Sequence, residues 1–297
     1  MQKEGVGSII GKETKTGREE LHMKYQVFNL REEPINGFMP TLTAYVIDDN
    51  STYAQKRMRP AVLVCPGGGY QFCSEREAEP IALQYMAAGM SAFVLDYSVA
   101  PANCYPEPQK DVFAAIRLIR KNAEEWGIDR NKIAVCGFSA GGHLAASAAT
   151  LWEDEMFATP DNINRPDAAI LCYPVISSVK GVAHEGSFDN LCREDADLRA
   201  KMALETRVSK NTPPCFLWHT FTDQAVPVEN SLLFAMALRK AGASCELHIY
   251  PEGQHGLSLA NSDTSPAEEM ILPRVQEWVG LSIKWLDGLF DKSKLGN

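Results

Sequence analysis

Short apolar runs of strand length recur along the chain, separated by longer segments with helical periodicity. Six such runs lie at 61–65, 91–95, 133–136, 168–172, 215–218 and 245–250. Uninterrupted apolar runs are typical of strands buried on both faces of a parallel sheet. Two further strands are expected at 24–30 and 42–47, with Asn36-Gly37 in the connection between them. The pattern therefore predicts an α/β fold whose sheet has eight strands.

Helical periodicity fills the gaps between these strands. It is clearest over 109–126, where the apolar residues share one face and Gly127 follows as a left-handed cap. A closing amphipathic helix is expected over 274–290. Strand–helix alternation with right-handed crossovers places helices on both faces of a mostly parallel sheet. No repeat or linker interrupts the chain, so residues 1–297 are expected to form a single domain.

The segment 173–214, between the sixth and seventh expected strands, is the place where a cap over the sheet is expected. It is polar and mixed in composition, with a helix expected over 195–205. It lacks the long apolar face of a lid that opens at an oily interface. A short cap that leaves an open cleft is therefore predicted.

A glycine-rich pentapeptide, Gly137-Phe138-Ser139-Ala140-Gly141, joins the strand at 133–136 to a segment rich in small helix-forming residues. A sharp strand-to-helix turn of the form G-x-S-x-G exposes its serine as a nucleophile, and the start of the helix favours negative charge there. The alternative is a structural serine in a glycine-rich turn. The strand, the turn and the small-residue helix together favour a nucleophilic Ser139.

A serine nucleophile needs a base and an acid, which in this arrangement follow it in the order acid, then histidine. Asp223 lies in the loop after the strand at 215–218, and His255 lies after the strand at 245–250. We therefore expect Asp223 and His255 to complete a catalytic triad with Ser139. His219, at the end of its strand, is the alternative base.

An oxyanion hole is expected from backbone N–H groups. One donor is the N–H of Ala140, directly after the serine, and the second is Gly68 or Gly69 in the glycine loop that follows the strand at 61–65. A phosphate-binding loop is the rival interpretation. Neither G-x-G-x-x-G nor G-x-x-x-x-G-K-[ST] fits this stretch, so nucleotide binding is not expected.

Five stretches resemble the α/β-hydrolase esterases, and most of all a branch of sugar-ester hydrolases that includes acetylxylan esterase-like proteins. They are Pro66-Gly67-Gly68-Gly69-Tyr70, Asp96 to Pro101, Gly137 to Leu144, His219 to Asn230 and His248 to Ala260. Pro66 stands where the wider family usually has histidine. The resemblance implies a serine carboxylesterase that cleaves short acetyl esters of carbohydrates, such as acetylated xylan oligosaccharides, through an acyl-enzyme. A peptidase or amidase of the same fold and a non-catalytic binding protein are the alternatives.

Four side chains are candidate substrate contacts. They are Tyr70, Tyr97, His184 and Phe221. Tyr70 follows the glycine loop and Phe138 precedes the serine, so both are expected to crowd the acyl group and favour acetyl. The expected partner is a small-molecule or oligosaccharide ester.

Charge, hydropathy and cysteine usage argue against nucleic-acid binding, membrane binding and secretion. Lys and Arg number 29 against 38 Asp and Glu, a formal net charge of −9, whereas nucleic acids and anionic membranes require a basic surface. No apolar stretch is long enough for a membrane span, and Met1 to Lys15 lacks the apolar core of a secretion signal. Most of the eight cysteines fall in or beside strand-like runs, which favours reduced thiols and a cytoplasmic location. No metal-type Cys or His spacing occurs, so no metal or cofactor is expected; homo-oligomerisation is left open.

Overall fold

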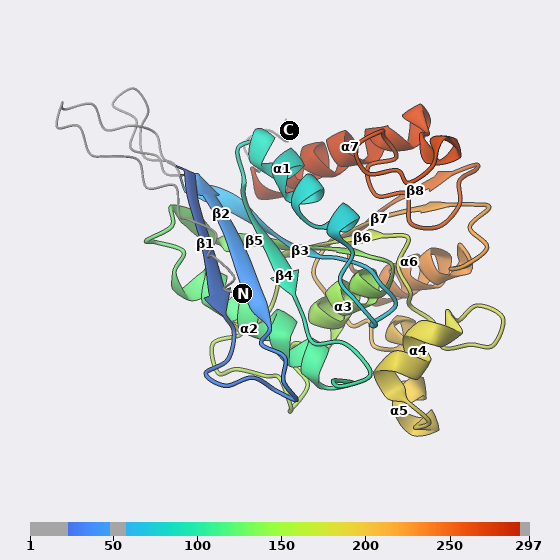
Figure 1. Cartoon of the computed structure of the whole chain (residues 1–297), viewed down its shortest axis with the longest axis horizontal. Coiled ribbons are helices and arrows are strands. Elements are labelled where there is room, and N and C mark those ends of the chain that lie inside the picture. The colour runs from blue at the N-terminus through green and yellow to red at the C-terminus, as the bar shows by residue number, and fades with distance from the viewer. Residues whose placement is uncertain (1–22, 48–57, 292–297) are drawn as a thin grey trace, which may run out of the picture.

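The structure is a computed structural model that describes residues 23–47 and 58–291; Met1 to Lys15, where no secretion signal is expected, lies outside these ranges. One sheet of eight strands runs through the described chain in the order β1-β2-β4-β3-β5-β6-β7-β8 (Figure 1). The strands are β1 (Met23–Asn29), β2 (Thr41–Ile47), β3 (Arg59–Cys65), β4 (Ser91–Asp96), β5 (Ile128–Phe138), β6 (Ala168–Cys172), β7 (Cys215–Thr220) and β8 (Cys245–Tyr250). The β1–β2 and β2–β4 pairs are antiparallel and the other five pairs are parallel. All eight expected strands are confirmed.

Helices cover both faces of the sheet (Figure 1). On one face lie α1 (Glu79–Ala87) and α7 (Pro273–Phe290), and on the other α2 (Glu107–Lys121), α3 (Ser139–Thr150) and α6 (Glu229–Ala241). Successive residues of β3 alternate between the two cores: Leu63 packs with α2 and α3, whereas Val62 and Val64 pack with α1 and α7. This two-sided burial explains why the central strands are uniformly apolar.

The C-terminal boundary of α2 differs from expectation. Helix α2 ends at Lys121 rather than near residue 126, and a turn continues to Gly127, whose φ of 63° is left-handed. The N–H of Ile128 then bonds the carbonyl of Ala123 at 2.7 Å, which closes the turn before β5. A glycine after the periodic stretch therefore marks the end of the turn and not the end of the helix.

The segment 173–214 carries two helices, α4 (Glu185–Cys192) and α5 (Ala196–Lys201), which lie next to each other (Figure 1). Three single 3-10 turns, η1 (Glu75–Glu77), η2 (Leu204–Thr206) and η3 (Glu268–Met270), complete the described elements. Helix α4 was not expected from the sequence, because its N-terminal cap is a histidine and not one of the usual Ser, Thr, Asp or Asn residues. No helix in the described ranges has both the length and the apolar character needed to cross a membrane.

Candidate active site

Ser139 lies at the junction of β5 and α3 with a φ of 52°, a left-handed conformation that non-glycine residues rarely adopt. The glycines on either side leave room for this turn. A Cβ on Gly137 would lie 2.0 Å from the carbonyl oxygen of Gly141, and a Cβ on Gly141 would lie 2.2 Å from the carbonyl oxygens of Cys65 and Pro66. The strand, the nucleophile helix and the glycine loop therefore meet at a point where no side chain fits.

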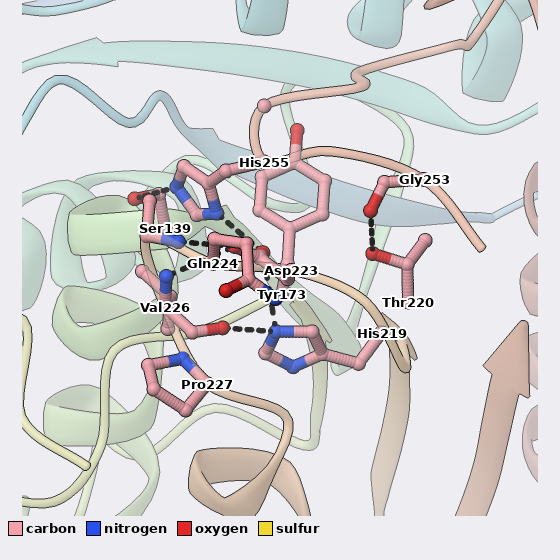
Figure 2. Close-up of polar contacts among 12 residues, drawn as sticks. Ser139, Tyr173, His219, Thr220, Asp223, Gln224, Val226, Pro227, Gly253 and His255 are labelled. Carbon is pink, nitrogen blue, oxygen red and sulfur yellow. Dashed lines mark hydrogen bonds and ion pairs between the residues drawn. The ribbon is translucent and has the colours of Figure 1, made fainter. Parts of the chain in front are cut away.

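Ser139, His255 and Asp223 lie within hydrogen-bond distance in a single chain of contacts (Figure 2). Nε2 of His255 is 2.7 Å from Oγ of Ser139, and its Nδ1 is 2.6 Å from Oδ2 of Asp223. A carboxylate only accepts hydrogen bonds, so Nδ1 carries the proton and Nε2 of the neutral ring is free to accept one. This tautomer allows His255 to act as a base toward the serine hydroxyl.

Asp223 is held as a charged carboxylate. Its Oδ1 accepts hydrogen bonds from the N–H groups of Ala225 and Val226, at 3.0 and 2.9 Å. Burial alone would raise the pKa of Asp223, but hydrogen bonds from His219, His255 and the backbone outweigh burial and hold that pKa well below its usual range. The acid therefore stays ionised next to the His255 ring throughout the neutral pH range.

His219, the alternative base, faces Asp223 (Figure 2). Its Nε2 donates to the carbonyl oxygen of Val226 at 2.9 Å and lies 3.4 Å from Oδ2 of Asp223, while Nδ1 contacts the Ser231 hydroxyl at 2.8 Å. The ring is fully buried, and its hydrogen-bond partners lie in the loop between β7 and α6 or in α6 itself. This geometry suits a residue that orients the acid and does not bring His219 to the serine.

The glycine loop presents backbone donors beside Ser139. Gly68 and Gly69 have φ values of 128° and 64°, and a Cβ on Gly68 would lie 2.0 Å from the carbonyl oxygen of Phe72. Among the described residues, none accepts a hydrogen bond from the N–H groups of Gly68, Gly69 or Ala140. The three N–H groups expected to form the oxyanion hole are therefore unpaired within the described part of the chain.

A buried carboxylate that the sequence did not single out links this loop to the histidine loop. Glu77 accepts hydrogen bonds from the N–H of Gly67 at 2.8 Å and from the Tyr173 hydroxyl at 2.6 Å. The Tyr173 oxygen in turn accepts from the N–H of Ser258 at 2.9 Å, and the Tyr173 ring lies edge-on to His255 with centroids 5.1 Å apart. No sequence signal marks Glu77, because it belongs to a polar stretch that is typical of a surface turn.

Three of the four candidate substrate contacts lie away from the cleft next to Ser139. Tyr70 and Tyr97 are buried behind the glycine loop, where their hydroxyl groups contact Nδ1 of His143 at 2.8 Å and the carbonyl oxygen of Pro66 at 2.7 Å. Phe221 is 65% exposed and is not part of the cleft wall. The two tyrosine side chains can be buried because their hydroxyl groups have hydrogen-bond partners inside the protein. They pack beneath the glycine loop.

The cleft itself has a volume of about 440 Å³ and contains Ser139 and His255 in its wall. Most of the remaining wall is polar, with Phe72, 57% exposed, as its aromatic member. The cap supplies one side through His184 and Asn190; the latter also donates to the carbonyl oxygen of Gly69 at 2.8 Å.

No group of three or more His, Cys, Asp or Glu residues within 23–47 and 58–291 is arranged to hold a metal ion.

His143, behind the glycine loop, is a buried histidine that should make the fold less stable in mild acid. Its Nε2 donates to the carbonyl oxygen of Met202 at 2.9 Å, and burial lowers its pKa to about 4. A folded-state pKa below the unfolded value of about 6.5 means that stability is lost as the pH falls below 6.5. Between pH 7 and pH 5, the wild type should lose about 2 kcal/mol more unfolding free energy than His143→Gln. Urea unfolding at both pH values measures this; equal losses in the two proteins would contradict it.

Comparison with known proteins agrees with this arrangement. Residues 50–238 match the BD-FAE protein family. The endo-1,4-beta-xylanase B of Butyrivibrio fibrisolvens is 40% identical over 236 residues, which cover 76% of this chain and 36% of that protein. The acetylxylan esterase of Xylanibacter ruminicola is 34% identical over 203 residues, which cover 66% of this chain and 40% of that protein. The chain thus spans less than half the length of these two relatives.

A solved structure extends the similarity to the fold. The acetyl ester-xyloside bifunctional hydrolase of Caldicellulosiruptor lactoaceticus superposes on the chain with a TM-score of 0.78 at 42% identity, covering 89% of this chain and 96% of that one. The mostly parallel eight-stranded sheet with helices on both faces confirms the expected fold class. The chain belongs to the BD-FAE family, has the α/β-hydrolase fold, and is similar to an acetylxylan esterase.

Proposed function

We propose that this protein is a serine carboxylesterase that removes acetyl groups from carbohydrate esters. The observation that carries the proposal is the chain of contacts from Asp223 through His255 to Ser139, at 2.6 and 2.7 Å, beside three unpaired backbone N–H groups. This combination supplies a nucleophile, a base and an oxyanion site at one place. The similarity to an acetylxylan esterase and to an acetyl ester-xyloside hydrolase supports the substrate class.

The proposed reaction has two acyl-transfer steps. Ser139 Oγ attacks the ester carbonyl while His255 Nε2 takes its proton, and the N–H groups of Ala140, Gly68 and Gly69 bind the oxyanion. His255 then gives that proton to the leaving alcohol, which leaves an acetyl group on Ser139. A water molecule, deprotonated by His255, attacks this acyl-enzyme; the bond to Ser139 Oγ then breaks, Oγ takes the proton back from His255, and acetic acid is released. The charged Asp223 stabilises the imidazolium form of His255 in both steps.

The acyl side is expected to favour acetyl. The wall of the cleft that contains Ser139 is mostly polar and offers no apolar trough for a long acyl chain. Phe138 does not crowd this side as expected, because it is buried against Tyr173 and Trp278 in the core shared with α7. A longer acyl chain therefore gains none of the roughly 0.8 kcal/mol that each buried methylene can contribute.

The corresponding prediction is a fall in kcat/KM from acetyl to butyryl to octanoyl among 4-nitrophenyl esters. Initial rates over a range of substrate concentrations measure the series, with one leaving group throughout to keep the alcohol constant. Octanoyl esters cleaved tenfold faster than acetyl esters would show that the acyl site is open.

The decisive experiment for the function compares acetylated xylo-oligosaccharides, a simple acetyl ester and an aminoacyl anilide. A carbohydrate esterase releases acetate from the first two and leaves the anilide intact. Cleavage of the anilide alone would favour the peptidase or amidase alternative. No turnover of any of the three would favour a non-catalytic binding protein.

We further infer that residues 1–297 form a single catalytic domain and that the protein works in the cytoplasm. All eight cysteines are free thiols, and a reducing compartment keeps such thiols unpaired. Fractionation of the source cells and limited proteolysis of the purified chain test these two inferences. An extracellular location or a stable proteolytic fragment with its own folding transition would refute the respective one.

A further inference from the structure

His184 lies directly beside the base, at the start of the cap helix α4. Its ring is nearly parallel to that of His255, with an interplanar angle of 17° and centroids 6.5 Å apart. Both rings contribute to the wall of the cleft that contains Ser139. His184 is therefore placed next to whatever part of the substrate approaches His255.

The protonation of the His184 ring follows from its hydrogen bonds. Nδ1 accepts from the backbone N–H of Ser187 at 3.3 Å, as the N-cap of α4, and lies 2.8 Å from the Ser187 hydroxyl. The Ser187 N–H also bonds the carbonyl oxygen of His184 at 3.1 Å, and its second contact, with Nδ1, favours the tautomer in which Nδ1 is unprotonated and the hydrogen of the neutral ring is on Nε2. No described residue pairs with that Nε2. Burial and the neighbouring His255 lower the pKa of His184, which keeps the ring neutral.

The reaction geometry defines which part of the substrate meets this donor. The carbonyl oxygen must lie at the N–H groups of Gly68, Gly69 and Ala140, whereas the leaving oxygen must reach Nε2 of His255 to be protonated. His184 lies beside His255 in the cleft wall, so the alcohol half of the ester is the part that approaches the His184 ring. A neutral N–H donor recognises an oxygen acceptor.

We propose that His184 is a specificity residue whose Nε2–H binds a hydroxyl oxygen on the carbon adjacent to the ester-bearing carbon of the alcohol. This inference rests on the proposed esterase function and narrows its substrate to monoesters of vicinal diols and polyols. The cap thus recognises the alcohol through one side chain. The same side chain is the N-cap of α4, where it accepts a hydrogen bond from the N–H of Ser187.

The test uses a matched pair of small esters, 2-hydroxyethyl acetate and propyl acetate, which differ by a hydroxyl in place of a methyl group. The two alcohols differ in intrinsic reactivity, so the diagnostic quantity is the change in their kcat/KM ratio between proteins. In His184→Asn, which keeps an acceptor for the N-cap but is too short to place a donor, this ratio should fall about three- to tenfold, the range of one neutral hydrogen bond. His184→Phe, which keeps a ring beside His255, should give the same fall in the ratio.

Asp195→Ala is the matched control. Asp195 caps the neighbouring helix α5 through the N–H of Leu198 at 2.9 Å and is not part of the cleft wall, so its loss disturbs the cap without touching the alcohol. In Asp195→Ala, the ratio of the two kcat/KM values should equal that of the wild type. In the wild type, ¹⁵N NMR of the His184 ring should show the Nε2–H tautomer.

Two results would overturn the proposal: a kcat/KM ratio in the His184 variants that equals that of the wild type, or a similar fall of the ratio in Asp195→Ala. Each of them leaves the esterase function standing, because propyl acetate is still hydrolysed by the wild type. If the wild type hydrolysed neither of the two esters, the proposed function would be refuted, and this inference with it.

Discussion

Ser139→Ala and His255→Ala should each lower kcat for 4-nitrophenyl acetate by about 10⁴-fold or more. The reason is geometric: the serine hydroxyl has His255 Nε2 at 2.7 Å as its proton acceptor, and neither group does chemistry without the other. The double variant should therefore be little worse than either single one, since the residues act as a unit. Burst-phase and steady-state release of 4-nitrophenol measure both losses. Circular dichroism should show that the variants remain folded.

Other histidines provide the controls for this assignment. His248 lies in β8 with its Nε2 2.9 Å from Oε1 of Glu246, and His248→Gln should retain turnover within twofold. His219→Gln removes a partner of Asp223 and should cause a loss well short of that in His255→Ala. Near-normal turnover in His255→Ala, together with abolished turnover in His219→Gln, would show that the base has been assigned to the wrong ring.

The sequence predicted the sheet well because each strand carries its own signal. Strands such as β6, buried on both faces, are apolar throughout and can be recognised without knowing their neighbours. The chain order of Ser139, Asp223 and His255 could be predicted for a related reason: each follows a recognisable strand, and the carboxyl ends of parallel strands share one edge of the sheet. The structure brings these three side chains together.

The supporting residues escaped prediction because they depend on contacts between distant segments. Glu77 and Tyr173 are 96 positions apart, and nothing in either neighbourhood indicates that a carboxylate and a phenol meet inside the protein. Tyr70 and Tyr97 were expected on the cleft wall, where an aromatic side chain can stack on a sugar ring. Their partners, a histidine on α3 and a backbone carbonyl, turned both side chains inward. Hydrophobic periodicity predicts which residues are buried, but it does not predict which buried polar groups form hydrogen bonds with one another.

Gly141→Ala should produce a large loss of stability. The new Cβ would lie 2.2 Å from two backbone oxygens, those of Cys65 and Pro66, and these cannot rotate away as a flexible side chain could. Either α3 or the start of the glycine loop must move, at a cost of about 3 kcal/mol or more. For a chain of this length, that corresponds to a melting temperature lower by roughly 6–12 °C.

Gly280→Ala is the matched control for this substitution, because Gly280 is also helical and a Cβ there meets no atom within 4 Å. It should leave the protein as stable as the wild type or more stable by up to about 1 kcal/mol, since alanine favours helix. Thermal and urea unfolding compare the three proteins. The fraction of Gly141→Ala that folds should also lose about 10²-fold in kcat/KM, because the displaced carbonyls belong to the residues that lead into the oxyanion donors of Gly68 and Gly69. Wild-type stability in Gly141→Ala would mean that the nucleophile helix and the glycine loop are not in the contact described, and that the oxyanion site is built in another way.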